Sequence, residues 1–286
     1  MTLAVHPTVT STDGTSIGYR SVGTGPGLAI VHGAMESASS HLELAIALSG
    51  SHTVHLLDRR GRGMSGPHRS SHDLSTEVDD LAAVLDATGA GDVFGVSSGA
   101  IVALEATLRL PQVRRVAIFE PPLIVANSLS TAFVARYRDE LAQGDLASAL
   151  VTAMKGSKMG PAIFSYVPRP LLRALTIVGM RREEQALGPD ESSMRALAPT
   201  LDYDFGLVEE ARNRLDLYAN TEAEVLLLGG EGSPVYLQRA MDWLAAALPR
   251  ARRVVLPGLG HGAAGNERVG GKPAVVAAAL EDFFSG

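Results

Sequence analysis

The chain has 286 residues, of which 46% are hydrophobic and 20% charged, so it has ample material for a large core. Its formal charge of −6 argues against a nucleic-acid partner, which would need a concentrated basic surface. The absence of cysteine excludes disulfides, thiolate nucleophiles and cysteine-based metal sites. No apolar stretch is long enough to span a membrane, and the first residues lack the pattern of a secretory signal. We therefore expect a cytoplasmic protein that acts on a small molecule, of undetermined oligomeric state.

Short apolar segments alternate with helical ones along much of the chain. In order, the expected elements are strands within 8–31, a helix over 38–48, a strand at 53–58, a helix over 76–89, a strand at 92–96, a helix over 98–110 and a strand at 114–120. The pattern resumes with a strand at 224–230, a helix over 235–248, a strand at 252–258 and a helix over 273–284. Apolar runs without alternation indicate strands buried on both faces of a mostly parallel sheet, and hence an α/β fold.

Residues 124–216 interrupt this alternation with a helix-like insert. It follows one predicted sheet strand and precedes the next, so it should lie over the carboxyl edge of the sheet, where ligands bind. We therefore divide the chain into a first core part at 1–123, a helical cap at 124–216 and a second core part at 217–286. The methionines of the insert either line an adaptable apolar pocket or pack within the cap; they are Met154, Met159, Met180 and Met194.

A serine lies on a predicted turn between a strand and a helix. Gly95-Val96-Ser97-Ser98-Gly99 fits the pattern G-x-S-x-G, directly after the strand at 92–96. This pattern is typical of a turn so tight that the serine backbone is strained and its hydroxyl projects outward; flanking side chains would collide, which favours glycine. Ser98 fits the spacing poorly. We predict that Ser97 is a nucleophile, the alternative being a turn in which glycine serves packing alone.

Three further stretches make the chain resemble the α/β-hydrolase superfamily along nearly its whole length. Val31–Ala34, VHGA, is similar to the His-Gly motif that leads into the family's oxyanion loop. Asp58–Ser65, DRRGRGMS, resembles a loop common in members with a cap, and Leu256–Ala263, LPGLGHGA, resembles the loop that carries the catalytic histidine. Together with the serine turn, the motifs stand in the family's order. The resemblance implies an α/β-hydrolase fold and a serine hydrolase with a catalytic triad.

A serine hydroxyl is a weak nucleophile near neutral pH and needs an adjacent base. Of the eight histidines, only His261 follows Ser97 in the chain, as the family order of serine, acid and histidine requires. Three others are expected to be structural: His32, His41 and His55. Four lie in polar or terminal stretches and are expected at the surface: His6, His52, His68 and His72.

The resemblance also locates the groups that would hold a developing oxyanion. It implies the backbone N–H of Ser98, directly after the nucleophile, and the backbone N–H of Ala34, after the His-Gly motif. Met35 is the alternative to Ala34. Side-chain identity matters little at such positions, so the sequence only locates them.

The acid of the triad departs from the family pattern. Relatives usually carry an aspartate a few residues past the strand at 224–230, where this chain has Ser233. Glu120 can substitute, because it ends the strand after the nucleophile helix, where a subset of the family carries its acid. Glu231 is the second option, two residues before the missing aspartate. We predict Glu120, whose alternative role is to pair with an arginine.

No motif indicates a cofactor or a metal. The chain lacks a Walker A pattern and H-E-x-x-H, and it has no G-x-G-x-x-G that directly joins a strand to a helix. Arg60, in the DRRGRG stretch, is expected to bond carbonyl groups of its own turn. The leading hypothesis is hydrolysis of a carboxylic ester or lactone of a mid-sized, fairly apolar substrate through an acyl-enzyme. The alternatives are an acyltransferase, lyase or cyclase that acts on a specialised metabolite, and a non-catalytic small-molecule receptor.

Overall fold

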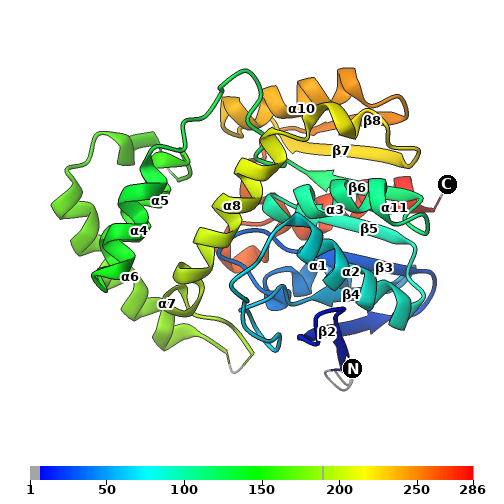
Figure 1. The fold of residues 1–286 in the computed structure, drawn as a ribbon, viewed down its shortest axis with the longest axis horizontal. Helices are drawn as coiled ribbons and strands as arrows, with labels where there is room; N and C mark the ends of the chain where they lie inside the picture. Colours follow the sequence, from blue (N-terminus) through cyan, green and yellow to red (C-terminus); the bar gives the residue numbers. More distant parts are fainter. Residues whose placement is uncertain (1–6, 161, 189, 286) are drawn as a thin grey trace.

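The computed structural model describes residues 7–160, 162–188 and 190–285. Its strands form one sheet in the order β1-β2-β4-β3-β5-β6-β7-β8 (Figure 1). Strand β2 is antiparallel to both β1 and β4, and every other neighbouring pair is parallel. The strands are β1 (Thr8–Thr10), β2 (Ser16–Gly23), β3 (Gly27–Val31), β4 (Thr53–Leu57), β5 (Asp92–Val96), β6 (Arg115–Phe119), β7 (Glu224–Gly230) and β8 (Ala251–Leu256).

Helices cover both faces of the sheet. The core helices are α1 (Leu42–Leu48), α2 (Leu74–Thr88), α3 (Ser98–Arg109), α10 (Val235–Ala247) and α11 (Pro273–Phe284). Ala29 and Val31 of β3 pack in a cluster with α2, α3 and α10, whereas Leu28 and Ile30 pack in a second cluster with α1 and α11. The inner strands β3, β4, β5 and β6 are therefore buried on both faces, which explains their apolar runs without alternation and confirms the predicted α/β fold.

The insert between β6 and β7 is helical. Its helices are α4 (Phe133–Ala142), α5 (Leu146–Gly156), α6 (Arg169–Ala186), α7 (Met194–Leu197), α8 (Leu201–Arg212) and α9 (Leu215–Tyr218). Figure 1 shows α4, α5, α6 and α7 as a lobe beside the sheet, with α8 returning toward the core. Ala34 and Met35, which follow β3, pack against a cluster that includes Tyr137 and Leu201 of the insert. The insert therefore covers the carboxyl end of β3.

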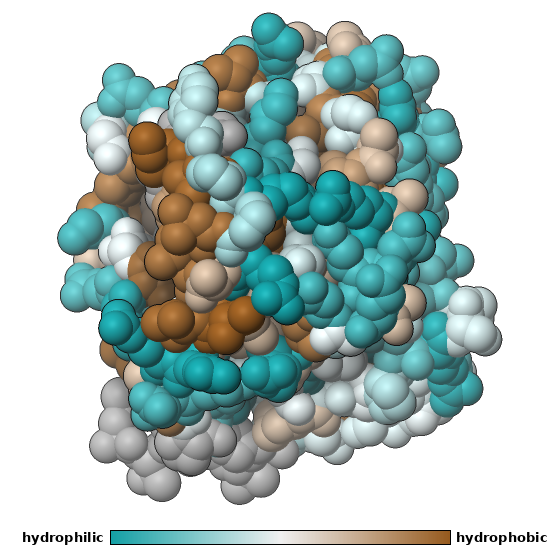
Figure 2. Space-filling view, turned by 90° about the vertical axis from the view of Figure 1, so that its left-hand side faces the viewer, coloured by the Kyte–Doolittle hydropathy of each residue, from teal (hydrophilic) through white to brown (hydrophobic). Residues whose placement is uncertain are grey.

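The outer face of the insert is partly apolar. Figure 2 shows hydrophobic surface gathered on the side of the molecule where the insert lies. Several large apolar side chains of the insert are exposed: Ile163, Tyr166, Leu171, Leu175 and Val178. Among the residues that the structure describes, no helix is both long enough and apolar enough to cross a membrane.

Candidate active site

Ser97 occupies a strained turn between β5 and α3. Its backbone has φ 53° and ψ −120°, in the left-handed region that side chains disfavour, and its N–H donates to the Phe119 carbonyl at 2.8 Å. The flanking glycines are required by packing. A Cβ at Gly95 would lie 2.5 Å from the Gly99 carbonyl oxygen, and one at Gly99 would collide with the Val31 carbonyl oxygen. The turn is thus held in the conformation that G-x-S-x-G demands.

The structure brings His261 and Glu120 to this serine. His261 Nε2 lies 3.1 Å from Ser97 Oγ, and His261 Nδ1 lies 2.7 Å from Glu120 Oε2. Glu120 follows β6 with φ 47° and is 1% exposed. Its other oxygen, Oε1, accepts a hydrogen bond of 2.7 Å from the Gly230 N–H. These contacts form a continuous chain from a buried carboxylate through an imidazole to a hydroxyl, which is the geometry of an activated serine.

The two other positions considered for the acid lie apart from this chain of contacts. Glu231 is exposed, and its Oε2 accepts from the Gly258 N–H at 2.9 Å, so it supports the loop after β8. Ser233 is buried, and its hydroxyl has no hydrogen-bond partner among the described residues. Over the same part of the chain, no hydrogen bond joins either side chain to His261.

The expected oxyanion donors lie on both sides of Ser97. Ser98 begins α3, so its N–H is one of those that a helix leaves without an intrahelical acceptor. Ala34 follows Gly33, whose backbone packs against the serine: a Cβ at Gly33 would lie 2.9 Å from Ser97 Cβ. Met35, the alternative donor, has φ 59°. Ala34 and Ser98 thus lie in segments adjacent to Ser97.

An ion pair between buried His41 and half-buried Glu36 supports the segment after β3. Glu36 Oε2 accepts from the Gly33 N–H at 2.6 Å and lies 3.1 Å from His41 Nε2. Nδ1 of His41 faces the Ala264 carbonyl at 2.9 Å, so both ring nitrogens face acceptors. Burial lowers the pKa of His41, but the charge of Glu36 outweighs it, and the pKa is raised above its ordinary value. His41 therefore favours the imidazolium form, which pairs with the carboxylate.

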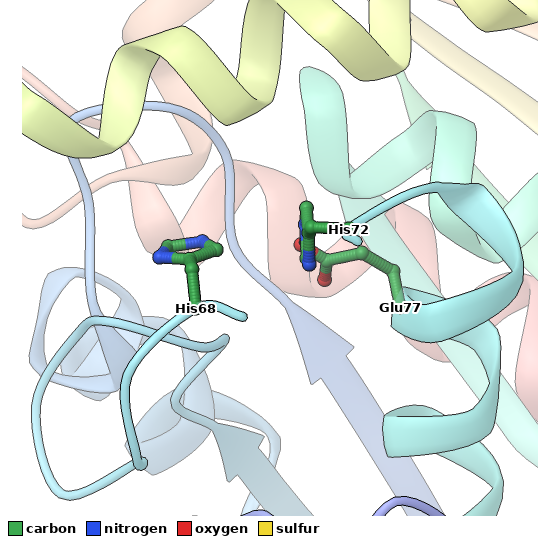
Figure 3. A group of neighbouring side chains, drawn as sticks. All are labelled: His68, His72 and Glu77. Carbon is green, nitrogen blue, oxygen red and sulfur yellow. The ribbon is translucent and has the colours of Figure 1, made fainter. Parts of the chain in front are cut away.

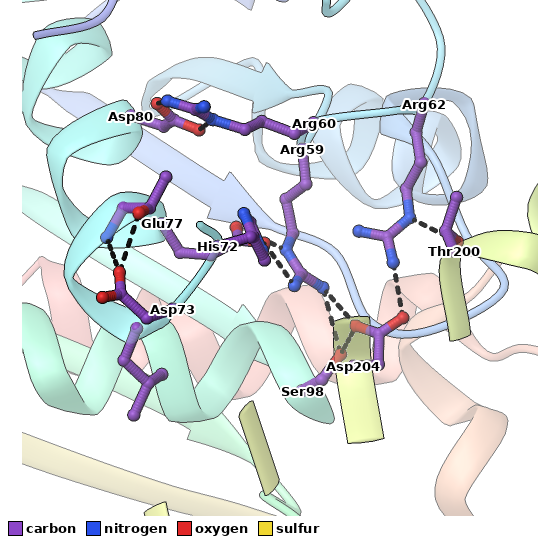
Figure 4. Close-up of polar contacts among 12 residues, drawn as sticks. Arg59, Arg60, Arg62, His72, Asp73, Glu77, Asp80, Ser98, Thr200 and Asp204 are labelled. Carbon is purple, nitrogen blue, oxygen red and sulfur yellow. Dashed lines mark hydrogen bonds and ion pairs between the residues drawn. The ribbon is translucent and has the colours of Figure 1, made fainter. Parts of the chain in front are cut away.

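Arg59 contacts the two segments that flank Ser97, and Figure 4 shows its contacts with Ser98 and Asp204. Its backbone N–H donates to His32 Nε2 at 3.1 Å, and its Nη1 donates to the hydroxyl of Ser98 at 3.1 Å. The guanidinium also binds both carboxylate oxygens of Glu77, each at 2.8 Å. Burial and the nearby arginines lower the pKa of His32 to about 3, so its ring is a neutral acceptor. Arg59 thereby bonds to residues of both segments next to Ser97.

Asp204, in helix α8 of the insert, completes this network. Its Oδ1 accepts from Ser98 Oγ at 2.8 Å and from Arg59 Nη1 at 2.9 Å, and its Oδ2 accepts from Arg62 Nη2 at 2.5 Å. Burial raises the pKa of Asp204, but Arg62 and Arg59 lower it further, and the net pKa is below its ordinary value. Arg62 also donates to Thr200. This network was not predicted from the sequence, in which the arginines of the DRRGRG stretch are the one sign that carboxylates lie nearby.

Arg60 has a different role from the one predicted. Instead of bonding carbonyl groups of its turn, its guanidinium binds both oxygens of Asp80 at 2.6 and 2.8 Å and one oxygen of Asp13 at 2.6 Å. The Arg60 side chain is fully buried, and a buried guanidinium needs carboxylate partners rather than neutral ones. It therefore joins the loop after β4 to α2 and to the turn before β2.

Two of the histidines expected at the surface, His52 and His72, are buried, and this part of the prediction is wrong. His68 is half-buried and stacks on Tyr203 of α8, with ring centroids 3.5 Å apart. Packing of the insert over residues 68–72 explains the burial of His68 and His72. His6 lies outside the described residues.

His68, His72 and Glu77 converge beneath α8 (Figure 3), each with one atom of metal-ligand type within 4.8 Å of the others. His72 Nε2 lies 3.0 Å from Glu77 Oε1. Both oxygens of Glu77 already accept from the Arg59 guanidinium. A divalent cation bound here would therefore lie beside a buried arginine and compete with it for the only carboxylate of the group. We assign no metal to this cluster.

A cavity of about 1050 Å³ lies between the insert and the core. Met154, Met159 and Phe164 of the insert and Tyr236 of α10 contribute to its lining, and the cavity reaches His261. Two of the four methionines considered in the sequence thus line a pocket, whereas Met180 is buried. A molecule in this cavity would reach the imidazole that lies 3.1 Å from the hydroxyl of Ser97.

Comparisons with known proteins agree with this architecture. Residues 28–279 match the model of the alpha/beta hydrolase family. The chain is 26% identical to 2-(acetamidomethylene)succinate hydrolase of Mesorhizobium japonicum over 86% of this chain and 85% of the relative. It is similar to a solved alpha/beta hydrolase from Sphaerobacter thermophilus, with a TM-score of 0.75, 31% identity and coverage of 97% of this chain and all of that one. A thermophilic esterase from Thermogutta terrifontis shares the fold at 18% identity, with a TM-score of 0.72 and coverage of 99% and 98%. The chain therefore belongs to the alpha/beta hydrolase family and is a hydrolase of this fold.

Proposed function

We propose that the protein is a serine hydrolase that cleaves a carboxylic ester or lactone through an acyl-enzyme intermediate. One observation carries the proposal: Glu120, His261 and Ser97 form a continuous chain with contacts of 2.7 and 3.1 Å. In this assignment Ser97 is the nucleophile, His261 the general base and then acid, and Glu120 the carboxylate that orients the imidazole.

The reaction follows from the direction of these contacts. Nδ1–H of His261 donates to Glu120, which leaves Nε2 free to take the proton of Ser97 as Oγ attacks the substrate carbonyl. The backbone N–H groups of Ala34 and Ser98 hold the oxyanion of the tetrahedral intermediate. His261 then protonates the leaving alkoxide, and water activated by the same imidazole releases the acid and frees Ser97.

In this proposal the insert, residues 124–216, is a cap, and the core consists of residues 1–123 and 217–286. The cavity below it has the size of a site for a mid-sized molecule, and Met154, Met159 and Phe164 make part of its wall apolar. The Mesorhizobium japonicum relative is a hydrolase of 2-(acetamidomethylene)succinate. That relative supports hydrolysis of a small organic molecule here.

Labelling with a fluorophosphonate tests the proposal without knowledge of the substrate. We expect the probe to modify Ser97, as located by mass mapping of the labelled peptide, and Ser97→Ala to abolish both labelling and release of free acid from p-nitrophenyl esters. Modification of a different serine, or esterase activity that survives Ser97→Ala, would contradict the assignment. Labelling at Ser97 with transfer of the acyl group to an added alcohol, and no free acid, would indicate an acyltransferase.

A further inference from the structure

The cavity beside His261 carries a local charge opposite to that of the whole chain. The chain has 31 acidic and 25 basic residues and a formal charge of −6. The described lining of the cavity nevertheless includes Lys155, Lys158 and Arg239 and contains no aspartate or glutamate. Such a reversal within one concave site points to a ligand of negative charge.

The cations of the lining come from both the insert and the core. Lys158 lies two residues after the end of α5 and belongs to the insert, whereas Arg239 lies in α10 and belongs to the core. Both are exposed, and neither forms an ion pair within the part of the chain that the structure describes. Lys155 Nζ donates to the Val167 carbonyl at 3.0 Å. Lys158 and Arg239 are thus exposed to solvent and line the cavity, so both can pair with an anionic ligand.

Neutral side chains and His261 share the described lining of the cavity with these cations. Met154, Met159 and Tyr236 provide apolar or weakly polar surface, and the imidazole of His261 lies 3.1 Å from the hydroxyl of Ser97. A substrate that fills this space needs an acyl group at Ser97, a mostly apolar chain and an anionic end. Arginine binds a carboxylate through two parallel hydrogen bonds, and lysine supplies a point charge on a flexible stem.

We propose that Lys158 and Arg239 bind a carboxylate that the substrate carries in addition to its scissile ester, so that the preferred substrates are half-esters of dicarboxylic acids. The inference rests on the proposed hydrolysis and names its substrate class. Because both side chains are exposed, the gain is modest and sensitive to salt. From two solvent-exposed charge pairs, we expect kcat/KM to be about tenfold higher for the charged substrate than for a neutral counterpart.

A matched pair of esters measures this preference. Mono-p-nitrophenyl suberate carries a free carboxylate, and methyl p-nitrophenyl suberate is its neutral counterpart. For the unmodified enzyme at low ionic strength, we expect kcat/KM to favour the charged ester by about tenfold, with the ratio falling as sodium chloride is added. In the double variant Lys158→Met and Arg239→Met, which keeps the side-chain stems, the ratio should fall toward one.

Arg182→Met is the control. Arg182 is exposed on α6 and is absent from the described lining of the cavity, so its loss removes one charge from the insert and should leave the ratio unchanged. A ratio at or below one for the unmodified enzyme would overturn the inference. A ratio that the double variant does not lower, or that Arg182→Met lowers equally, would overturn it as well.

A binding measurement separates this inference from the proposed reaction. By calorimetry, the Ser97→Ala variant should bind monomethyl suberate more tightly than dimethyl suberate, and the Lys158 and Arg239 substitutions should remove that difference. If the anion preference is present but the fluorophosphonate fails to label Ser97, the proposed hydrolysis is wrong and the anion site stands. If Ser97 is labelled but neither calorimetry nor kinetics shows a preference, the anion site is wrong and the hydrolysis stands.

Discussion

The carboxylate of Glu120 lies between two hydrogen-bond donors, which makes Glu120→Gln a sharp test of the proposed mechanism. Oε1 accepts from the Gly230 N–H at 2.7 Å, and Oε2 faces His261 Nδ1 at 2.7 Å. In glutamine, the amide oxygen has to face the Gly230 N–H, because the amide NH₂ would otherwise oppose another donor. The NH₂ then faces His261 Nδ1, which must become an acceptor. The imidazole proton therefore moves to Nε2, the atom that should take the proton of Ser97.

The size of the effect follows from this reversal of the tautomer. The substitution keeps the shape of the side chain and the Gly230 contact, so KM and thermal stability should change little. The base is lost, however, and the imidazolium formed during the reaction loses its carboxylate. In an unrelated protease, the same change of carboxylate to amide lowers kcat by about 10⁴, equivalent to about 5 kcal/mol of transition-state stabilisation. We expect a similar loss here.

Steady-state hydrolysis of p-nitrophenyl esters measures this loss, and Glu231→Gln provides the matched control. Glu231 accepts from the Gly258 N–H at 2.9 Å and takes no part in the proposed proton transfer. Its substitution should keep kcat within about a factor of three, since surface changes of this kind rarely exceed 0.5 kcal/mol. The reasoning is refuted if Glu120→Gln retains more than about a tenth of the activity, or if Glu231→Gln is the variant that loses it.

Asp204→Asn should lower the free energy of unfolding by about 3 kcal/mol or more, because it leaves the buried Arg62 without a carboxylate. The control Asp202→Asn, on the same helix, removes a partly exposed ion pair with Arg138 and should cost less than about 1 kcal/mol by urea denaturation; equal losses would contradict the role of burial. The raised pKa of His41 means that its pairing with Glu36 contributes fully below the ordinary value of 6.5 and is lost as pH rises through the folded-state pKa. The stability difference between the unmodified protein and His41→Gln should therefore shrink as pH rises above 6.5, and a difference that grows would refute the assignment.

The fold was predictable because its signals are local. The strand expected at 92–96 is β5 with the same bounds, and the helix expected over 273–284 is α11. Helix α2 begins at Leu74, two residues before the expected start, because the Asp73 side chain accepts from the Thr76 N–H and caps the helix. The segment at 38–48 begins with a 3₁₀ turn over Ala38–His41 before α1.

In the candidate site, too, the residues in local sequence motifs could be predicted, whereas the contacts that depend on tertiary packing could not. Ser97 and His261 could be located from a short motif and from chain order, since both lie in segments with a characteristic pattern. The contact of Arg59 with Asp204 joins residues 145 positions apart, and it depends on how α8 packs on the core. The prediction that His72 lies at the surface was wrong for the same reason. The polar stretch around it does not indicate that a helix of the insert covers it.

Asp204 ties the insert to the chemistry of the core in a way that matters for engineering. The carboxylate belongs to α8, yet it pairs with Arg59 and Arg62 of the core, and Arg59 also donates to the hydroxyl of Ser98. Replacing the insert with a short loop would remove the carboxylate partner of Arg62, leave Arg59 paired with Glu77 alone and release the hydroxyl of Ser98 from Asp204. A chimera that takes the corresponding insert from another hydrolase would therefore need an acidic side chain at the position of Asp204. Without that side chain, an exchanged insert would not satisfy the arginines of the core.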